Sequence, residues 1–243
     1  MTTLPLSPPD ALTSAIAGRL AAIRGRMAAA ARAAGRRPED VRLVAVSKTF
    51  DIGYVRAAAA AGQVDFGENR VQEALQKIAQ SSDLQIRWHL VGHLQSNKAR
   101  RAAAAFALIH SVDSAALLEE IDRAAAAAGT APALLVQVDL AREPTKHGAP
   151  VSDLPAIFEA AARCRAAAVT GLMLLPPLGR DPEASRPYFR ELRALRERLA
   201  QDGVPAAMLR ELSMGMSRDF EIAIEEGATL VRIGTALFGG RHV

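Results

Sequence analysis

Lysine is rare in this chain of 243 residues, and one lysine stands where it could act as a nucleophile. Four lysines occur against 26 arginines: Lys48, Lys77, Lys98 and Lys146. Lys48 follows the apolar run LVAVS, so its amine is expected to emerge from an apolar wall where desolvation disfavours the ammonium form. A neutral amine can form a Schiff base with an aldehyde, whereas a guanidinium cannot. A lysine that ends a strand and reaches water is the alternative interpretation of Lys48 taken alone.

Two later segments, SMGMS at 213–217 and RIGT at 232–235, combine glycines with hydroxyl side chains. Backbone N–H groups in such segments can surround a phosphate, which barrel enzymes commonly bind beyond their last two strands. Together with Lys48, they indicate a phosphate ester that carries an aldehyde. Pyridoxal 5′-phosphate (PLP) fits, with Lys48 as the Schiff-base partner and Arg232 facing the ring nitrogen. A class I aldolase acting on a sugar phosphate would use the same two features without a cofactor and is an alternative.

Short apolar runs alternate with helical patterns along the chain, after a leading amphipathic helix expected from about Asp10 to Ala34. The eight predicted strands are Val41–Ser47, Val64–Phe66, Arg87–Val91, Leu108–Ser111, Ala133–Asp139, Ala168–Met173, Met208–Ser213 and Thr229–Ile233. The predicted helices between them, with their caps, are Asp51–Gly62, Asn69–Gln80, Ser96–Phe106, Ser114–Gly129, Ser152–Arg165, Asp181–Gln201 and Ser217–Gly227.

This alternation predicts an α/β fold, a single (β/α)8 TIM-type barrel with an extra N-terminal helix. We expect one domain over 1–243, with the leading helix in 1–40 and the barrel in 41–243. An open doubly wound sheet is the alternative, but it should show a glycine-rich fingerprint after its first strand, where this chain has Ser47-Lys48-Thr49-Phe50. The chemistry of such barrels sits at the C-terminal ends of the strands, which is where Lys48 and the two glycine segments are expected.

Composition excludes several classes of protein. With 50% hydrophobic and 23% charged residues, the chain is expected to be globular and neither fibrous nor disordered. One cysteine, Cys164, excludes an intrachain disulfide framework and favours a cytoplasmic location, and no stretch predicts secretion or membrane spanning. The net charge of +4 could suggest nucleic acid, but aromatic residues are only 4%. The basic run from Arg186 to Arg198 is also interleaved with glutamates, so no nucleic-acid partner is expected.

Other polar residues have simpler interpretations. His89 and His93 are four residues apart, but on a predicted strand, so they do not form a helical metal pair and no metal site is expected. Trp88 is expected to pack in the barrel, and Glu68 to cap the following helix, with orientation of Asn69 as the alternative. Lys146 is expected to be a solvated loop lysine, with a second aldehyde-reactive amine as the alternative.

Seven ordered motifs spread over nearly the whole chain resemble the YggS/PROSC family of pyridoxal phosphate homeostasis proteins. They are LVAVSKTF, FGENRVQEALQK, WHLVGHLQSNKAR, HSVDS, TKHG, GLMLLPP and LSMGMSRDFEIAIEEGATLVRIGTALFG. The resemblance implies a barrel related to the N-terminal domain of alanine racemase, with PLP on Lys48. It also implies that Ser213, Gly234 and Thr235 hold the phosphate, that Arg232 faces the pyridine nitrogen, and that Asn69 and Met216 contact the cofactor or its surroundings. It assigns no role to His147.

The resemblance further implies intracellular PLP, vitamin B6 and amino-acid homeostasis without evident catalytic turnover, so no catalytic residue is assigned. Physical chemistry agrees, because a guanidinium such as Arg232 cannot give its proton to the pyridine nitrogen and therefore weakens the electron sink. Related racemases also take an acid or base from a second domain that is not expected here. A racemase-like PLP enzyme is the remaining alternative. PLP and PLP-dependent apoenzymes are the expected partners of a monomer.

Overall fold

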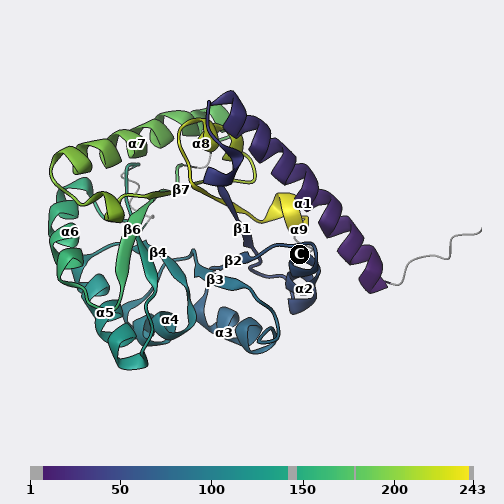
Figure 1. Cartoon of the computed structure of the whole chain (residues 1–243), viewed down its shortest axis with the longest axis horizontal. Coiled ribbons are helices and arrows are strands. Elements are labelled where there is room, and N and C mark those ends of the chain that lie inside the picture. Colours follow the sequence, from purple (N-terminus) through teal and green to yellow (C-terminus); the bar gives the residue numbers. More distant parts are fainter. Residues whose placement is uncertain (1–7, 142–146, 178, 241–243) are drawn as a thin grey trace, which may run out of the picture.

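Eight parallel strands close into a barrel in the computed structural model, which describes residues 8–141, 147–177 and 179–240 (Figure 1). The strands are β1 (Arg42–Val46), β2 (Asp65–Glu68), β3 (Arg87–Leu90), β4 (Leu108–Val112), β5 (Ala133–Gln137), β6 (Ala168–Met173), β7 (Glu211–Met216) and β8 (Leu230–Ile233). Each strand pairs with the next along the chain, and β8 closes the barrel by pairing with β1. The predicted (β/α)8 barrel is confirmed.

Helices surround the barrel (Figure 1). The α-helices are α1 (Pro8–Ala33), α2 (Ile52–Ala60), α3 (Val71–Ala79), α4 (Ala99–Ala105), α5 (Ala115–Ala128), α6 (Leu154–Arg163), α7 (Arg186–Gln201), α8 (Phe220–Glu225) and α9 (Thr235–Phe238). Short 3-10 turns are η1 (Pro38–Asp40), η2 (Ser96–Lys98), η3 (Val151–Asp153), η4 (Pro182–Ser185) and η5 (Ala206–Met208). Two predicted N-caps are confirmed, because Asp51 accepts a hydrogen bond from the Gly53 N–H and Ser114 accepts one from the Leu117 N–H.

The long helix α1 lies across one side of the barrel, against α2, α8 and α9 (Figure 1). Its buried residues Ile16, Leu20, Ile23 and Met27 recur every three or four positions. This spacing places them on one face of the helix, which is therefore the face that packs on the barrel.

Alternate residues of each strand face opposite sides of the barrel wall. One apolar cluster joins the helices to strand residues such as Leu43, Ala45 and Val231, so these point outward. A separate cluster includes Val44 and Val46 from β1 with residues from β4, β5, β6 and β8, and it fills the barrel interior. Trp88 belongs to the outward cluster, where its ring lies 5.8 Å from that of Phe66, so its predicted packing role is confirmed.

The largest difference from the predicted elements concerns β7, which was expected at Met208–Ser213 but runs from Glu211 to Met216. Gly215 lies within the strand at a φ of 89°, in the left-handed region. The pairing of β7 with β8 shifts register between Ser213 and Met216, as a β-bulge does. A side chain on Gly215 would also meet the Ala223 side chain at 2.5 Å, so glycine is required there by both conformation and space.

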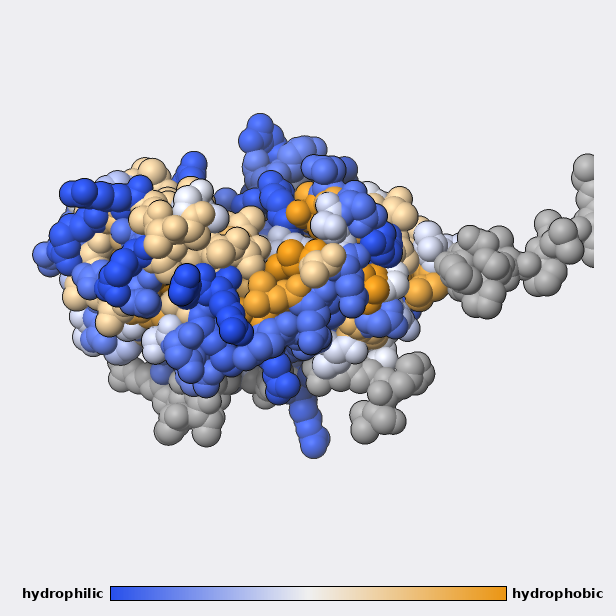
Figure 2. Space-filling model, turned by 90° about the horizontal axis from the view of Figure 1, so that it is seen from below, coloured by the Kyte–Doolittle hydropathy of each residue, from blue (hydrophilic) through white to orange (hydrophobic). Residues whose placement is uncertain are grey.

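The surface of the molecule is mixed in character. Figure 2 shows a hydrophobic patch near the middle of one face, bordered by hydrophilic residues. Among the described residues, the exposed large apolar side chains are Val64 and Val151. None of the described helices has the length and apolarity needed to cross a membrane.

Candidate cofactor site

A cavity of about 440 Å³ lies at the C-terminal ends of β1, β2, β6, β7 and β8. Six of the seven residues that the sequence predicted for the site line its wall: Lys48, Asn69, Met216, Arg232, Gly234 and Thr235. The inward-facing Val46 and Val91 lie beside them, so the cavity is continuous with the barrel interior. Lys48 and Thr235, which are 187 positions apart in the sequence, therefore share one pocket.

Ser213, the seventh predicted residue, is not on this wall. Because β7 extends to Met216, Ser213 lies within the strand and not at the barrel mouth, and its side chain is fully buried. Its hydroxyl lies 2.9 Å from His110 Nδ1 and accepts a hydrogen bond of 2.5 Å from Arg232. Ser213 therefore lies beside Arg232 in the barrel interior, and its expected contact with a phosphate stays a prediction.

Ser217 takes the place at the mouth that the sequence assigned to Ser213. It lines the cavity, and its hydroxyl accepts a hydrogen bond of 3.3 Å from the Ala236 N–H, which connects the loop after β7 to the turn after β8. The buried Asp219 holds the same loop, because one carboxylate oxygen accepts from the Met216 N–H at 2.7 Å and the other from the Ser185 hydroxyl at 2.9 Å. Neither Ser217 nor Asp219 was predicted as a site residue.

The backbone directly after Lys48 adopts a conformation that a β-branched residue rarely takes. Thr49 has a φ of 69°, in the left-handed region. Such a conformation costs on the order of 1–3 kcal/mol and persists only where its surroundings enforce it. The Thr49 N–H donates a hydrogen bond of 2.8 Å to Glu73 on α3, which helps to hold this turn. The strain therefore lies in the turn that presents Lys48 to the cavity.

A buried ion pair lies outside the barrel wall at the same strand ends. Lys77 of α3 donates a hydrogen bond of 2.7 Å to Glu68 and one of 2.8 Å to the Ser47 carbonyl. The Ser47 hydroxyl also donates to Glu68, at 2.6 Å. Burial raises the pKa of Glu68, although Lys77 and Ser47 oppose this rise. Glu68 thus joins β1, β2 and α3 behind Lys48, and the expectation that it caps the following helix is wrong.

Asn69 was expected to begin the helix that α3 forms, but the helix begins at Val71 and Arg70 occupies its N-cap. Asn69 instead belongs to the cavity wall. Its backbone packs so closely on Gly92 that a side chain there would meet the Asn69 carbonyl oxygen at 2.3 Å. Gly92 is therefore required for the close approach of the loops after β2 and β3.

Inside the barrel, a chain of polar side chains runs from Arg232 to Asp65. Ser213 lies between Arg232 and His110, and His110 Nε2 lies 3.1 Å from His89 Nδ1. His89 Nε2 in turn lies 3.0 Å from a carboxylate oxygen of Asp65. All five side chains are buried and come from β2, β3, β4, β7 and β8. We call this set, Arg232, Ser213, His110, His89 and Asp65, the interior chain.

The positions of the protons in the interior chain follow from the charges of its two end residues, Asp65 and Arg232, and from the neutrality of the two histidines between them. Burial lowers the pKa of His89 and lowers that of His110 well below its usual range, so both rings are neutral near pH 7. Burial opposes ionisation of Asp65, but hydrogen bonds from His89 and Arg87 outweigh it and lower its pKa to about 2.

Because a carboxylate only accepts, the His89 proton is on Nε2, and His89 Nδ1 accepts from His110 Nε2–H. His110 Nδ1 then accepts from the Ser213 hydroxyl, whose oxygen accepts from Arg232. Each contact between neighbours in the interior chain therefore joins one donor to one acceptor.

The interior chain holds Arg232 through an uncharged partner, the Ser213 hydroxyl. A second hydrogen bond, of 2.8 Å to the Leu174 carbonyl, fixes the guanidinium further. Burial lowers the pKa of Arg232 to about 10, against the pull of Asp219. The guanidinium therefore remains a cation at neutral pH, and no carboxylate is hydrogen-bonded to it within the described part of the chain.

Two further predictions about single residues have different outcomes. His89 and His93 do not share a site, since His89 belongs to the interior chain whereas His93 lies near Asp113 at the barrel mouth. Lys146 lies outside the described residues, so both interpretations of it stay predictions.

The cavity residues fit PLP in three respects. Lys48 offers an amine for an aldehyde, Arg232 offers a fixed cation for the pyridine nitrogen, and Ser217, Gly234 and Thr235 offer hydroxyl or backbone donors for a phosphate. The volume of about 440 Å³ lies within the range of small-molecule sites.

Comparisons with known proteins agree with this fit. The sequence model of the family described as alanine racemase, N-terminal domain, matches residues 19–242 of this chain. Pyridoxal phosphate homeostasis proteins of Pseudomonas aeruginosa and Aquifex aeolicus are 43% and 42% identical to the chain, covering 94% and 92% of it and 96% and 97% of their own lengths.

The solved structure of PipY from Synechococcus elongatus, with PLP bound, is 44% identical, covers 92% of this chain and 100% of its own, and has a TM-score of 0.82. The motifs, the barrel and these matches agree that the chain belongs to the pyridoxal phosphate homeostasis protein family, within the alanine racemase N-terminal domain fold.

Proposed function

We propose that this chain carries PLP as a Schiff base on Lys48 and takes part in PLP, vitamin B6 and amino-acid homeostasis without evident turnover. The observation that carries the proposal is the single cavity that joins Lys48, Arg232 and the turns after β7 and β8. Formation of the Schiff base joins the Lys48 nitrogen to the aldehyde carbon and releases one water molecule. When bound, PLP supplies an electrophilic aldehyde and an aromatic ring that can accept electrons.

Each side chain has a defined part in this proposal. Lys48 forms the covalent bond, and Arg232 donates to the pyridine nitrogen. The Ser217 hydroxyl and the backbone N–H groups of Gly234 and Thr235 bind the phosphate. The hydrogen bond from the Ala236 N–H to Ser217 brings these donors close together. Ser213 acts as a positioning residue through Arg232. Asn69 and Met216 flank the cofactor from the turns after β2 and β7.

The same geometry argues against efficient chemistry at an amino-acid Cα. Arg232 stays protonated and has neutral partners, so it favours an unprotonated pyridine ring, which is a weak electron sink. Racemisation also needs an acid and a base on opposite faces of the ring. The described residues of the cavity wall include no histidine, tyrosine or cysteine, and its two carboxylates, Asp181 and Asp219, each accept a backbone N–H hydrogen bond.

We therefore expect no appreciable racemase, decarboxylase or transaminase turnover with common amino acids. Solvent deuterium exchange at Cα is the measurement, because it detects proton removal even when no product accumulates. Exchange on the order of 1 per second or faster, typical of enzymes, would show that the chain is a PLP enzyme. A Lys48→Ala variant is the control for exchange by free PLP.

Homeostasis requires that the bound PLP be exchangeable, and hydrolysis of the Schiff base returns PLP and the free Lys48 amine. PLP-dependent apoenzymes are the partners that we propose for the released cofactor. A monomeric state and a cytoplasmic location stay predictions, the latter from the single cysteine Cys164.

A further inference from the structure

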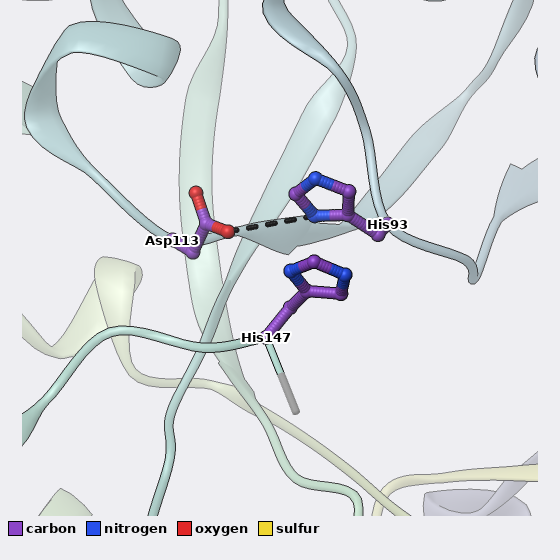
Figure 3. A group of neighbouring side chains, drawn as sticks. All are labelled: His93, Asp113 and His147. Carbon is purple, nitrogen blue, oxygen red and sulfur yellow. Dashed lines mark ion pairs between the residues drawn. The ribbon is translucent and has the colours of Figure 1, made fainter. Parts of the chain in front are cut away.

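Three side chains with metal-binding groups meet at the barrel mouth, away from the Lys48 cavity (Figure 3). His93 follows β3, Asp113 directly follows β4, and His147 lies in the segment after β5. One possible ligand atom of each lies within 4.8 Å of those of the other two. None of the three lines the described wall of the Lys48 cavity.

The spacing of these groups suits a shared ion better than a direct hydrogen bond. His93 Nδ1 and Asp113 Oδ2 are 3.6 Å apart, which is longer than a good hydrogen bond. Ligand atoms that share a tetrahedral metal at about 2.0–2.1 Å are separated by about 3.3–3.4 Å. The His93–Asp113 pair would therefore need only a small movement to share an ion.

The imidazole rings of His93 and His147 stack, with centroids 3.6 Å apart and planes 8° from parallel (Figure 3). A metal binds an imidazole through a lone pair in the plane of the ring, so the two rings must turn relative to each other to share an ion. Both side chains have solvent access that leaves room for this rotation, and His147 is exposed. The His147 backbone is held, because its carbonyl accepts a hydrogen bond from Gln137 of β5.

The donor set selects a class of metal. Two imidazole nitrogens and one carboxylate oxygen suit zinc and its first-row neighbours, whereas calcium and magnesium prefer oxygen ligands alone. Three protein ligands leave at least one position for water or an anion. An open hollow beside His93 and Asp113, lined also by Ser114 and Glu120, has space for such a ligand.

We propose that His93, Asp113 and His147 form a three-ligand site for a divalent transition metal of the zinc class. The sequence alone predicted no metal site, because the nearest histidine to His93 is His89, four residues earlier on a predicted strand. The structure supplies instead two partners that are 20 and 54 residues further along the chain. A bound ion would connect the segments after β3, β4 and β5.

Cobalt(II) and zinc(II) binding to PLP-loaded protein tests this proposal. We expect one equivalent of Co²⁺ to produce visible d–d bands and Zn²⁺ to displace it. His147→Ala and Asp113→Asn should weaken Zn²⁺ binding by at least the factor that loss of an outer-shell partner costs, about 10- to 100-fold. PLP affinity should not change in either variant, since neither residue is in the Lys48 cavity.

Two control variants address other ligands. His242→Ala removes the histidine of the C-terminal segment, and Cys164→Ser removes the only thiol, so neither should alter the affinity or the spectrum. Less than one equivalent bound, or equal affinity in His147→Ala, Asp113→Asn and the parent protein, would overturn the proposal. A sulfur-to-cobalt charge-transfer band that disappears in Cys164→Ser would overturn it as well.

Discussion

Apoprotein should bind PLP about 10²- to 10⁴-fold more tightly than pyridoxal, because only PLP carries the phosphate. Two charge-assisted hydrogen bonds from donors such as Ser217 and Thr235 contribute roughly 1.5 to 3 kcal/mol each, or about 3 to 6 kcal/mol together. Pyridoxal retains the aldehyde, so the comparison isolates the phosphate while Lys48 remains able to react. Its internal hemiacetal enlarges the difference somewhat. Equilibrium titration of apoprotein with both aldehydes gives the ratio.

Two serine variants separate phosphate binding from the positioning of Arg232. Ser217→Ala removes a hydroxyl of the cavity wall, so it should weaken PLP alone and reduce the ratio. Ser213→Ala removes the buried partner of Arg232, so it should weaken both aldehydes similarly and leave the ratio unchanged. Equal affinity of the parent protein for PLP and pyridoxal would mean that the turns after β7 and β8 bind no phosphate.

The free energy of unfolding should fall as the pH drops below 6.5, because of His89 and His110. The pKa of each buried imidazole is lowered from 6.5 in the folded protein, chiefly by burial. Below that pH the unfolded chain binds protons that the folded chain does not, so acid favours unfolding. The slope is at most about 1.4 kcal/mol per pH unit for each histidine. Urea unfolding between about pH 8 and pH 5 measures it.

Non-titrating replacements provide the comparison. Glutamine at both positions, His89→Gln with His110→Gln, keeps a donor and an acceptor in each side chain but should abolish most of this slope. His93→Ala changes a partly exposed histidine and should keep most of it. If the double variant does not fold, the imidazole NMR signals of the parent protein decide. Titration of the His89 or His110 ring with an ordinary midpoint near 6.5 would contradict the neutral interior chain.

The barrel and most of the site could be predicted from sequence because local patterns carry that information. Each strand is a short apolar run between capped helices, and parallel strands bring their C-terminal ends to one side of the barrel. Lys48, Arg232 and the turn at Gly234 are read directly from such strand ends. The motifs then added the assignment of PLP, which the residues alone left open beside an aldolase.

The sequence could not predict interactions that depend on which face of a strand a residue occupies. The strand β7 continues past Ser213, through the bulge at Gly215, to Met216, so Ser213 lies in the interior and not at the mouth. The interior chain joins residues from five strands, and the Glu68–Lys77 pair depends on how α3 packs. The sequence did contain an indication that Lys77 forms an ion pair, since it is one of only four lysines and follows Glu73 by four residues.

Borohydride reduction of the PLP-loaded protein, followed by tryptic mapping, tests the central claim most directly. Trypsin normally cleaves after Lys48, but a reduced pyridoxyl group would block that cleavage and leave the peptide LVAVSKTFDIGYVR, residues 43–56, with the added mass. We expect this peptide from the parent protein and from a Lys98→Ala control, and no pyridoxyl peptide from Lys48→Ala. Label found only on Lys146, or on none of the four lysines, would contradict the account.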